Sequence, residues 1–141
     1  MKPDRLLLDT HVWIWLSFGS TGRLKPGTRK LLESASADRP LYVSIISIWG
    51  IAMLSTKNRL SLFMPLGAWV ERALDHPGIK LIGLDRTSIV IDSCQLPGDP
   101  HADPADRFLI ATAREMKLTL VTGDKKILGY GKAGSVQVLA A

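Results

Sequence analysis

The sequence predicts an α/β fold in which a mainly parallel central sheet is covered by helices on both faces. Three observations support this prediction. Short apolar runs recur along the chain, and they alternate with longer segments whose apolar residues have helical spacing. Turn-forming Gly, Pro, Asp and Ser residues stand at the junctions. Strands that alternate with helices build a parallel sheet that is buried on both sides.

The strands are predicted from the apolar runs. Leu6-Leu7-Leu8 contains no polar residue, which is typical of a strand buried on both faces. We expect further strands at residues 41–43, 79–84 and 118–121, and an edge strand at 136–139. In such sheets, ligands bind beyond the carboxyl ends of the strands.

The helices are predicted from apolar spacing and from capping residues. Helices are expected at 11–18, 26–37 and 65–75, with loops at 19–27 and 96–102. Four more are expected to follow capping residues, which are Ser44, Asp85, Asp103 (with Pro104 at the first helical position) and Asp124. In the helix after Ser44, the expected buried face consists of Ile45, Ile48, Trp49, Ala52 and Met53.

Composition narrows the class of protein. A chain of 141 residues suits one domain spanning residues 1–141. Its net charge of +5 favours a polyanionic partner, although the same charge is explained equally by solubility. The single cysteine, Cys94, cannot form an internal disulfide, so a reducing compartment is expected. Asp9 and His11 interrupt the apolar start, and residues 41–54 are too few to span a bilayer. We therefore expect a cytoplasmic protein without a membrane segment.

Carboxylates stand where predicted strands end and helices begin. Asp9 follows the first strand, Asp103 and Asp106 open a helix, and Asp124 follows a late strand. Each of them, taken alone, is explained by capping or by favourable electrostatics at a helix start. Together, acids at one sheet edge repel one another unless a cation joins them. Mg²⁺ prefers such oxygen ligands and supports attack on phosphodiesters.

Three segments resemble signature blocks of PIN domains of the VapC toxin type. They are LLLDTHVWIWL, SIISIWGIAML followed by STKNRLSL, and DPADRFLIATAREMKLTLVTGD. The resemblance covers nearly the whole chain. It implies a PIN-like α/β/α sandwich and a Mg²⁺- or Mn²⁺-dependent endoribonuclease toxin that cleaves RNA. It also implies neutralisation by a small antitoxin, whose tail fills the acidic groove, and a homodimer.

The resemblance assigns roles to individual residues. It implies that Asp9, Asp106 and Asp124 are the catalytic metal ligands, that Asp103 is an auxiliary acid, and that Thr122 helps to position water at the metal.

The chain departs from this family pattern at Gly50, where a glutamate is expected. A glycine inside a helix costs about 1 kcal/mol relative to alanine, and no turn or cap accounts for it here. One interpretation is close helix packing that only glycine permits. The other is loss of an acidic ligand, either natural or introduced. On the second interpretation, the chain is a weak or inactive module that still binds RNA or antitoxin.

Other residues are weaker candidates. His11 follows Asp9 closely enough to face the site. The four tryptophans are candidates for stacking on bases; burial is expected for Trp49, and one of Trp13 and Trp15 is expected to be exposed at a partner surface. Candidate phosphate contacts are Arg86, Arg107, Arg114, Lys125 and Lys126. A phosphoacceptor receiver-like domain also places acids at strand ends, but the first strand here is not followed by paired acids.

Overall fold

The computed structural model describes residues 5–98, 100 and 103–141. Its centre is a five-stranded sheet in the order β3-β2-β1-β4-β5, and every neighbouring pair is parallel. The predicted fold class is confirmed. The strands are β1 (Leu6–Leu8), β2 (Leu41–Ser44), β3 (Ile79–Ile82), β4 (Thr119–Thr122) and β5 (Val138–Ala140).

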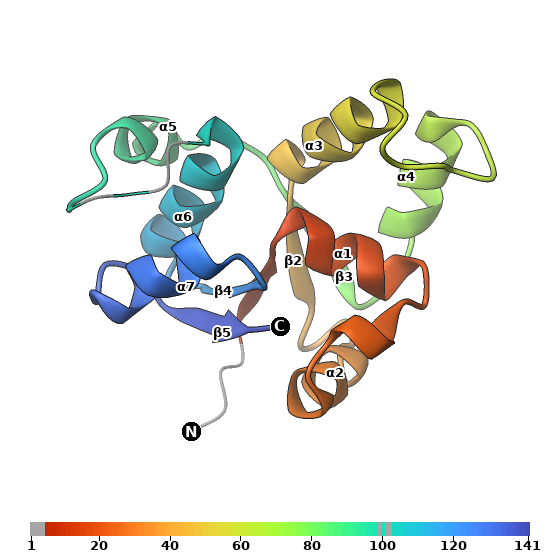
Figure 1. Cartoon of the computed structure of the whole chain (residues 1–141), viewed down its shortest axis with the longest axis horizontal. Helices are drawn as coiled ribbons and strands as arrows, with labels where there is room; N and C mark the ends of the chain where they lie inside the picture. The colour runs from red at the N-terminus through yellow and green to blue at the C-terminus, as the bar shows by residue number, and fades with distance from the viewer. Residues whose placement is uncertain (1–4, 99, 101–102) are drawn as a thin grey trace.

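Helices cover the two faces of this sheet in separate groups (Figure 1). One face carries α1 (Thr10–Ser17), α2 (Pro26–Glu33), α3 (Ile45–Thr56) and α4 (Leu66–Leu74), together with the short 3-10 turn η1 (Thr21–Arg23). The other face carries α5 (Thr87–Cys94), α6 (Pro104–Met116) and α7 (Lys125–Lys132). None of the helices in the described ranges is both long enough and apolar enough to cross a membrane.

The first strand joins two hydrophobic cores. Leu7 points into the core beneath α5, α6 and α7, whereas Leu6 and Leu8 point into the core beneath α1 to α4. Successive side chains of a strand face opposite sides of the sheet, so an all-leucine strand suits a position that is buried on both faces. All three leucines are buried, as the sequence predicts.

Two local predictions are wrong. Asp85 does not cap the fifth helix, because α5 starts at Thr87 and its N-cap, Arg86, makes no side-chain cap bond. In α3, the side chains buried most completely are Ser47 and Ile51, whereas Trp49 is 52% exposed. The helix itself carries apolar residues on all of its sides, so the spacing of apolar residues alone does not identify the face that is buried. Of the predicted loop 96–102, residues 99, 101 and 102 lie outside the described part.

The order of the strands creates a crevice at one edge of the sheet. The chain runs from β1 outwards to β2 and β3, then crosses back to β4 on the other side of β1. Neighbouring strands therefore lead into helices on opposite faces of the sheet, and a crevice opens at their carboxyl ends. Asp9 follows β1, and its backbone N–H donates to the carbonyl of Val121 in β4 at 2.9 Å. This pairing positions the candidate site.

Candidate active site

A cleft of roughly 580 Å³ lies at this carboxyl edge. Its walls come from α1, α3, the turn after α3, the start of α6 and the loop between β4 and α7. All four predicted acids line it, as do Gly50 and His11. The lining residues are Asp9, Thr10, His11, Trp15, Trp49, Gly50, Met53, Leu54, Lys57, Arg59, Asp103, Ala105, Asp106, Gly123 and Asp124.

A chain of hydrogen bonds connects the two central strands at the floor of the cleft. The Thr122 hydroxyl donates to Asp9 Oδ2 at 2.7 Å, and the backbone N–H of Asp124 donates to the same hydroxyl at 3.0 Å. The backbone N–H of Thr10 donates to Asp9 Oδ1 at 2.7 Å. Both oxygens of the Asp9 carboxylate are thus held in place. Thr122 does not line the cleft itself; it orients Asp9 from behind.

Burial dominates the electrostatics of Asp9. The side chain is buried, and desolvation raises the pKa of Asp9 above its ordinary value of 3.8. The hydrogen bonds from Thr122 and Thr10 and the charge of His11 oppose this rise, whereas the negative charge of Asp124 adds to it. A buried carboxylate beside a second acid gains from a nearby cation, because the cation favours its charged form.

Asp103 and Asp124 act as helix caps and also line the cleft. Asp124 Oδ1 accepts from the backbone N–H groups of Lys126 and Ile127 at 2.8 and 3.1 Å. Asp103 Oδ1 accepts from the backbone N–H of Asp106 at 3.2 Å. The capping predicted for both is therefore confirmed. Capping fixes where each carboxylate stands, so it is compatible with a role in the cleft.

The donor chemistry of the cleft suits a hard divalent cation. Its acids offer carboxylate oxygens, one of them from a buried group that a cation would stabilise. Among the described residues, however, no three Asp, Glu, His or Cys side chains stand close enough together to hold one ion. The acids line one cleft without forming a closed cage. Such a layout suits Mg²⁺, which keeps several waters and takes one or two carboxylates.

Gly50 faces this cleft from α3. A Cβ atom placed there would lie 3.3 Å from Thr10 Cγ2 and 3.5 Å from Thr10 Oγ1. The Thr10 hydroxyl donates to Ser47 Oγ at 3.0 Å, which ties α1 to α3 at this point. The contact is tight but involves a side-chain methyl group, so a side chain at position 50 requires Thr10 to shift by a few tenths of an ångström. A longer side chain would start beside Thr10, next to Asp9.

The cleft contains two basic residues that the sequence analysis missed, Lys57 and Arg59. The sequence could have predicted the position of Lys57, because it follows Gly50 by seven residues, which is two turns along the same face of a helix. Among the predicted phosphate contacts, Arg114 is unsuitable, because it donates to Asp92 at 2.9 Å and to the Ser135 carbonyl at 2.6 Å. The other candidates, Arg86, Arg107, Lys125 and Lys126, lie outside the lining.

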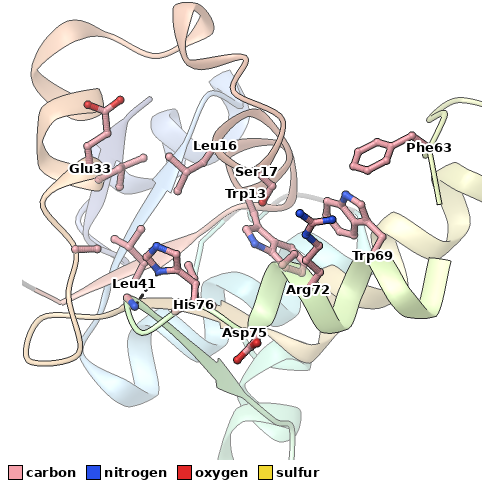
Figure 2. Close-up of a pocket in the computed structure, with 15 residues that line it drawn as sticks. Trp13, Leu16, Ser17, Glu33, Leu41, Phe63, Trp69, Arg72, Asp75 and His76 are labelled. Atoms are coloured by element: carbon pink, nitrogen blue, oxygen red, sulfur yellow. Dashed lines mark hydrogen bonds between the residues drawn. The ribbon is translucent and has the colours of Figure 1, made fainter. Parts of the chain in front are cut away.

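A second cavity, of roughly 550 Å³, lies between α1, α2 and α4 and reaches the start of β2 and β3 (Figure 2). Trp13 and Trp69 pack against each other there, with ring centroids 5.6 Å apart. Both are buried, so Trp13 is not the exposed aromatic of a partner surface. Its two acids, Glu33 and Asp75, stand well apart in Figure 2. The described residues that line this cavity are rich in aromatic rings and include no acidic cluster.

Comparisons with known proteins agree with the geometry. Residues 6–132 match the family model of the PIN domain. Ribonuclease VapC22 of Mycobacterium tuberculosis is 32% identical over 125 residues, which cover 89% of this chain and 91% of that protein.

Solved structures with the same fold are complexes of toxin–antitoxin type. VapBC of Salmonella typhimurium bound to DNA matches with a TM-score of 0.62 and 18% identity, covering 96% of this chain and 97% of the other. VapBC2 of Rickettsia felis bound to a promoter DNA fragment matches with a TM-score of 0.61 and 12% identity, at the same coverages. At these identities the likeness concerns the fold alone.

Proposed function

The chain belongs to the PIN-domain family, in its VapC-type branch, and from this premise we propose that it is a divalent-metal-dependent endoribonuclease toxin. Its acidic cleft hydrolyses RNA phosphodiesters, and a cognate antitoxin neutralises it. The observation that supports this proposal best is that Asp9, Asp106 and Asp124, from three distant parts of the chain, line one cleft.

Each of these residues has a proposed part in the chemistry. Mg²⁺ or Mn²⁺ would be held at Asp9, Asp106 and Asp124, with one or two of these carboxylates binding the ion directly and the rest reaching it through its waters. When bound, the ion supplies an activated water and offsets the charge of the phosphodiester. Thr122 fixes the direction of the Asp9 carboxylate through its 2.7 Å hydrogen bond. Asp103 holds the first turn of α6 and, with it, Asp106.

The test combines cleavage with metal binding. A labelled single-stranded RNA is incubated with the chain in Mg²⁺, in Mn²⁺ and in EDTA, and the melting temperature is followed through the same titrations. We expect cleavage in the presence of either ion and a rise in melting temperature by mass action. Asp9→Asn should remove both effects. An Asp9→Asn protein with an unchanged metal-dependent shift would show that the metal site is elsewhere.

A second candidate function follows from Gly50. Without the glutamate of the family pattern, the chain is a module that binds RNA or antitoxin and cleaves poorly. Gly50→Glu tests this idea, because it adds a carboxylate beside Thr10 and removes a helix-interior glycine. If a ligand has been lost, divalent ions should bind more tightly and cleavage should rise.

Two further variants sharpen this test. Gly50→Gln is the matched control, because it has almost the same size and lacks the charge. Thr10→Ser removes the methyl group that lies 3.3 Å from the new Cβ and keeps the hydroxyl that bonds to Ser47. If Gly50→Glu unfolds and the double variant with Thr10→Ser folds, close packing explains the glycine. A folded Gly50→Glu protein that behaves like Gly50→Gln in metal binding and cleavage would refute the lost-ligand interpretation.

The antitoxin is the proposed partner at the acidic cleft. Four aspartates line the cleft, against two basic residues, so a partner segment that fills it should be basic. We expect the cognate antitoxin to suppress cleavage and to compete with divalent ions. Antitoxin binding that stays unchanged from EDTA to saturating Mg²⁺ would place the antitoxin at another surface.

A further inference from the structure

One face of α3 forms a wall of the cleft that the proposed catalysis does not use. Trp49, Met53 and Lys57 follow one another at intervals of four residues, so they lie along one side of the helix. All three line the cleft, and the Trp49 side chain is 52% exposed. Arg59, just beyond the helix, lines it as well.

The two cations at the end of this face are held by a rigid turn. Asn58 has a left-handed backbone with φ of 55°. Its backbone N–H donates to the Ser55 carbonyl at 3.1 Å, and the N–H of Arg59 donates to the Leu54 carbonyl at 2.9 Å. This pair of bonds is the Schellman arrangement, in which asparagine is a common left-handed residue. The backbone that carries Lys57 and Arg59 is therefore fixed relative to the helix.

We propose that this face is a binding track for single-stranded RNA, with Trp49 stacking on a base and Lys57 and Arg59 binding phosphates. The proposal rests on the ribonuclease function. Trp49 lies beside Gly50, which faces Thr10 next to Asp9, so the track starts at the acids. Lys57 lies eight residues farther on, about 12 Å along the helix axis.

Charge and shape both favour this ligand. The four aspartates alone would repel a polyanion, and Lys57 and Arg59 are the basic side chains that the cleft offers against them. An exposed indole face accepts a base only when the base has left its helical stack, which selects unpaired RNA over duplex. The tryptophan supplies affinity that does not depend on salt, and the cations supply affinity that does.

The test measures the affinity of a fluorescein-labelled ten-nucleotide single-stranded RNA for the full chain carrying Asp9→Asn, in Mg²⁺, across a range of KCl concentrations. Replacing both cations, Lys57→Gln with Arg59→Gln, should lower the slope of log affinity against log salt by about 1.4, which is 0.7 for each lost phosphate contact. The matched control replaces Lys80 and Lys117 by Gln. Both lie outside the cleft lining, so the same loss of charge should leave the slope unchanged.

Trp49→Ala should weaken binding by about 5- to 100-fold without changing the salt slope, and Trp49→Phe should recover most of the loss. A duplex RNA of equal length should compete poorly. Equal slopes for the two double variants would overturn the track. A Trp49→Ala protein that keeps its RNA affinity would overturn it too, and a change in its sedimentation would then place Trp49 at an interface between copies of the chain. If the wild-type chain cleaves RNA while the Trp49 and Lys57/Arg59 variants bind it normally, the binding track is refuted and the ribonuclease function is not. A wild-type chain that neither binds nor cleaves RNA refutes the ribonuclease function as well.

Discussion

The two cavities of this protein have nearly the same volume, about 580 and about 550 Å³, and opposite chemistry. The first is lined by acids that cap helices at the carboxyl edge of a parallel sheet. The second is lined by tryptophans and aliphatic side chains packed between helices. Helix α1 contributes lining residues to both cavities, since Trp15 lines the cleft and Trp13 lines the aromatic cavity. The volume of a cavity therefore does not distinguish the candidate active site from the aromatic cavity, whereas the position of the charged side chains does.

This contrast predicts that the two regions respond differently to substitution. The aromatic cavity is part of the hydrophobic core, so changes there should alter the free energy of unfolding and leave metal affinity unchanged. The cleft carries buried and capping carboxylates, so changes there should alter metal binding and cleavage more than stability. Trp13 and Thr122 test this separation directly, and two further experiments examine the burial of Asp9 and the surface outside both cavities, from the largest expected effect to the smallest.

Trp13→Ala should lower the free energy of unfolding by about 3–5 kcal/mol, because it removes a fully buried ring that packs against Trp69. Trp13→Phe is the control. It keeps an aromatic ring and removes the indole Nε1 group, which has no hydrogen-bond acceptor among the described residues, so its cost should be much smaller. Urea denaturation measures both. An equal loss in the two variants would show that the indole N–H is paired after all.

Thr122→Val should lower metal affinity or cleavage by about 10- to 100-fold, because it removes the hydroxyl that orients Asp9 and keeps the side-chain shape. Thr122→Ser keeps that hydroxyl and serves as the control. Titration with Mn²⁺ and the RNA cleavage rate are the measurements. A Thr122→Val protein with normal values for both would remove Thr122 from the site.

Asp9→Asn should make the metal-free protein more stable at neutral pH. Burial raises the pKa of Asp9 in the folded state above the value of 3.8 that applies in the unfolded chain. The protonated form therefore stabilises the fold fully below pH 3.8, and this stabilisation is lost as the pH rises through the raised pKa. The gain in melting temperature from Asp9→Asn should therefore be small near pH 4 and grow towards pH 7. Thermal melts in EDTA across this range measure it. A gain that is constant with pH would contradict the assigned burial effect.

The homodimer implied by the family resemblance should involve neither cavity. Val90 and Ile91 leave adjacent apolar side chains exposed on α5, 41% and 56% respectively. Ile91→Lys should shift sedimentation from twice the 15.4 kDa chain mass to the single mass, with stability changed by less than about 0.5 kcal/mol. Phe63→Lys, at the rim of the aromatic cavity, is the control. Dissociation by the control instead would move the interface to that cavity.

The sequence predicted the parts of the fold that follow from local chemistry. The leucines of β1 identified a doubly buried strand, and Ser44, Asp103 and Asp124 identified helix starts because their side chains accept from the helix backbone. The same positions predicted which acids share a cleft, since the carboxyl ends of parallel strands meet at one edge.

The remaining features depend on packing that periodicity does not encode. Helix α3 is apolar on every side, so the exposure of Trp49 was decided by which face α1 and α6 cover. Trp13 is buried because α4 packs against it with Trp69, a contact between residues far apart in sequence. Asp85 stands one residue too early to cap α5. The contact between Gly50 and Thr10 also emerges only from the pairing of α1 with α3.

The central position of β1 has a consequence for how the protein is made. Leu6 pairs with Leu41 on one side and with Thr119 on the other, so β1 cannot complete its pairing until β4 has been synthesised. Asp9 gains its Thr122 partner only after residues 119–122 have emerged and docked. A nascent chain therefore has no assembled cleft until the residues up to Asp124 have been synthesised. The RNA cleavage that we propose would therefore begin only after this point in synthesis, and the proposed antitoxin would need to bind only chains whose cleft has formed.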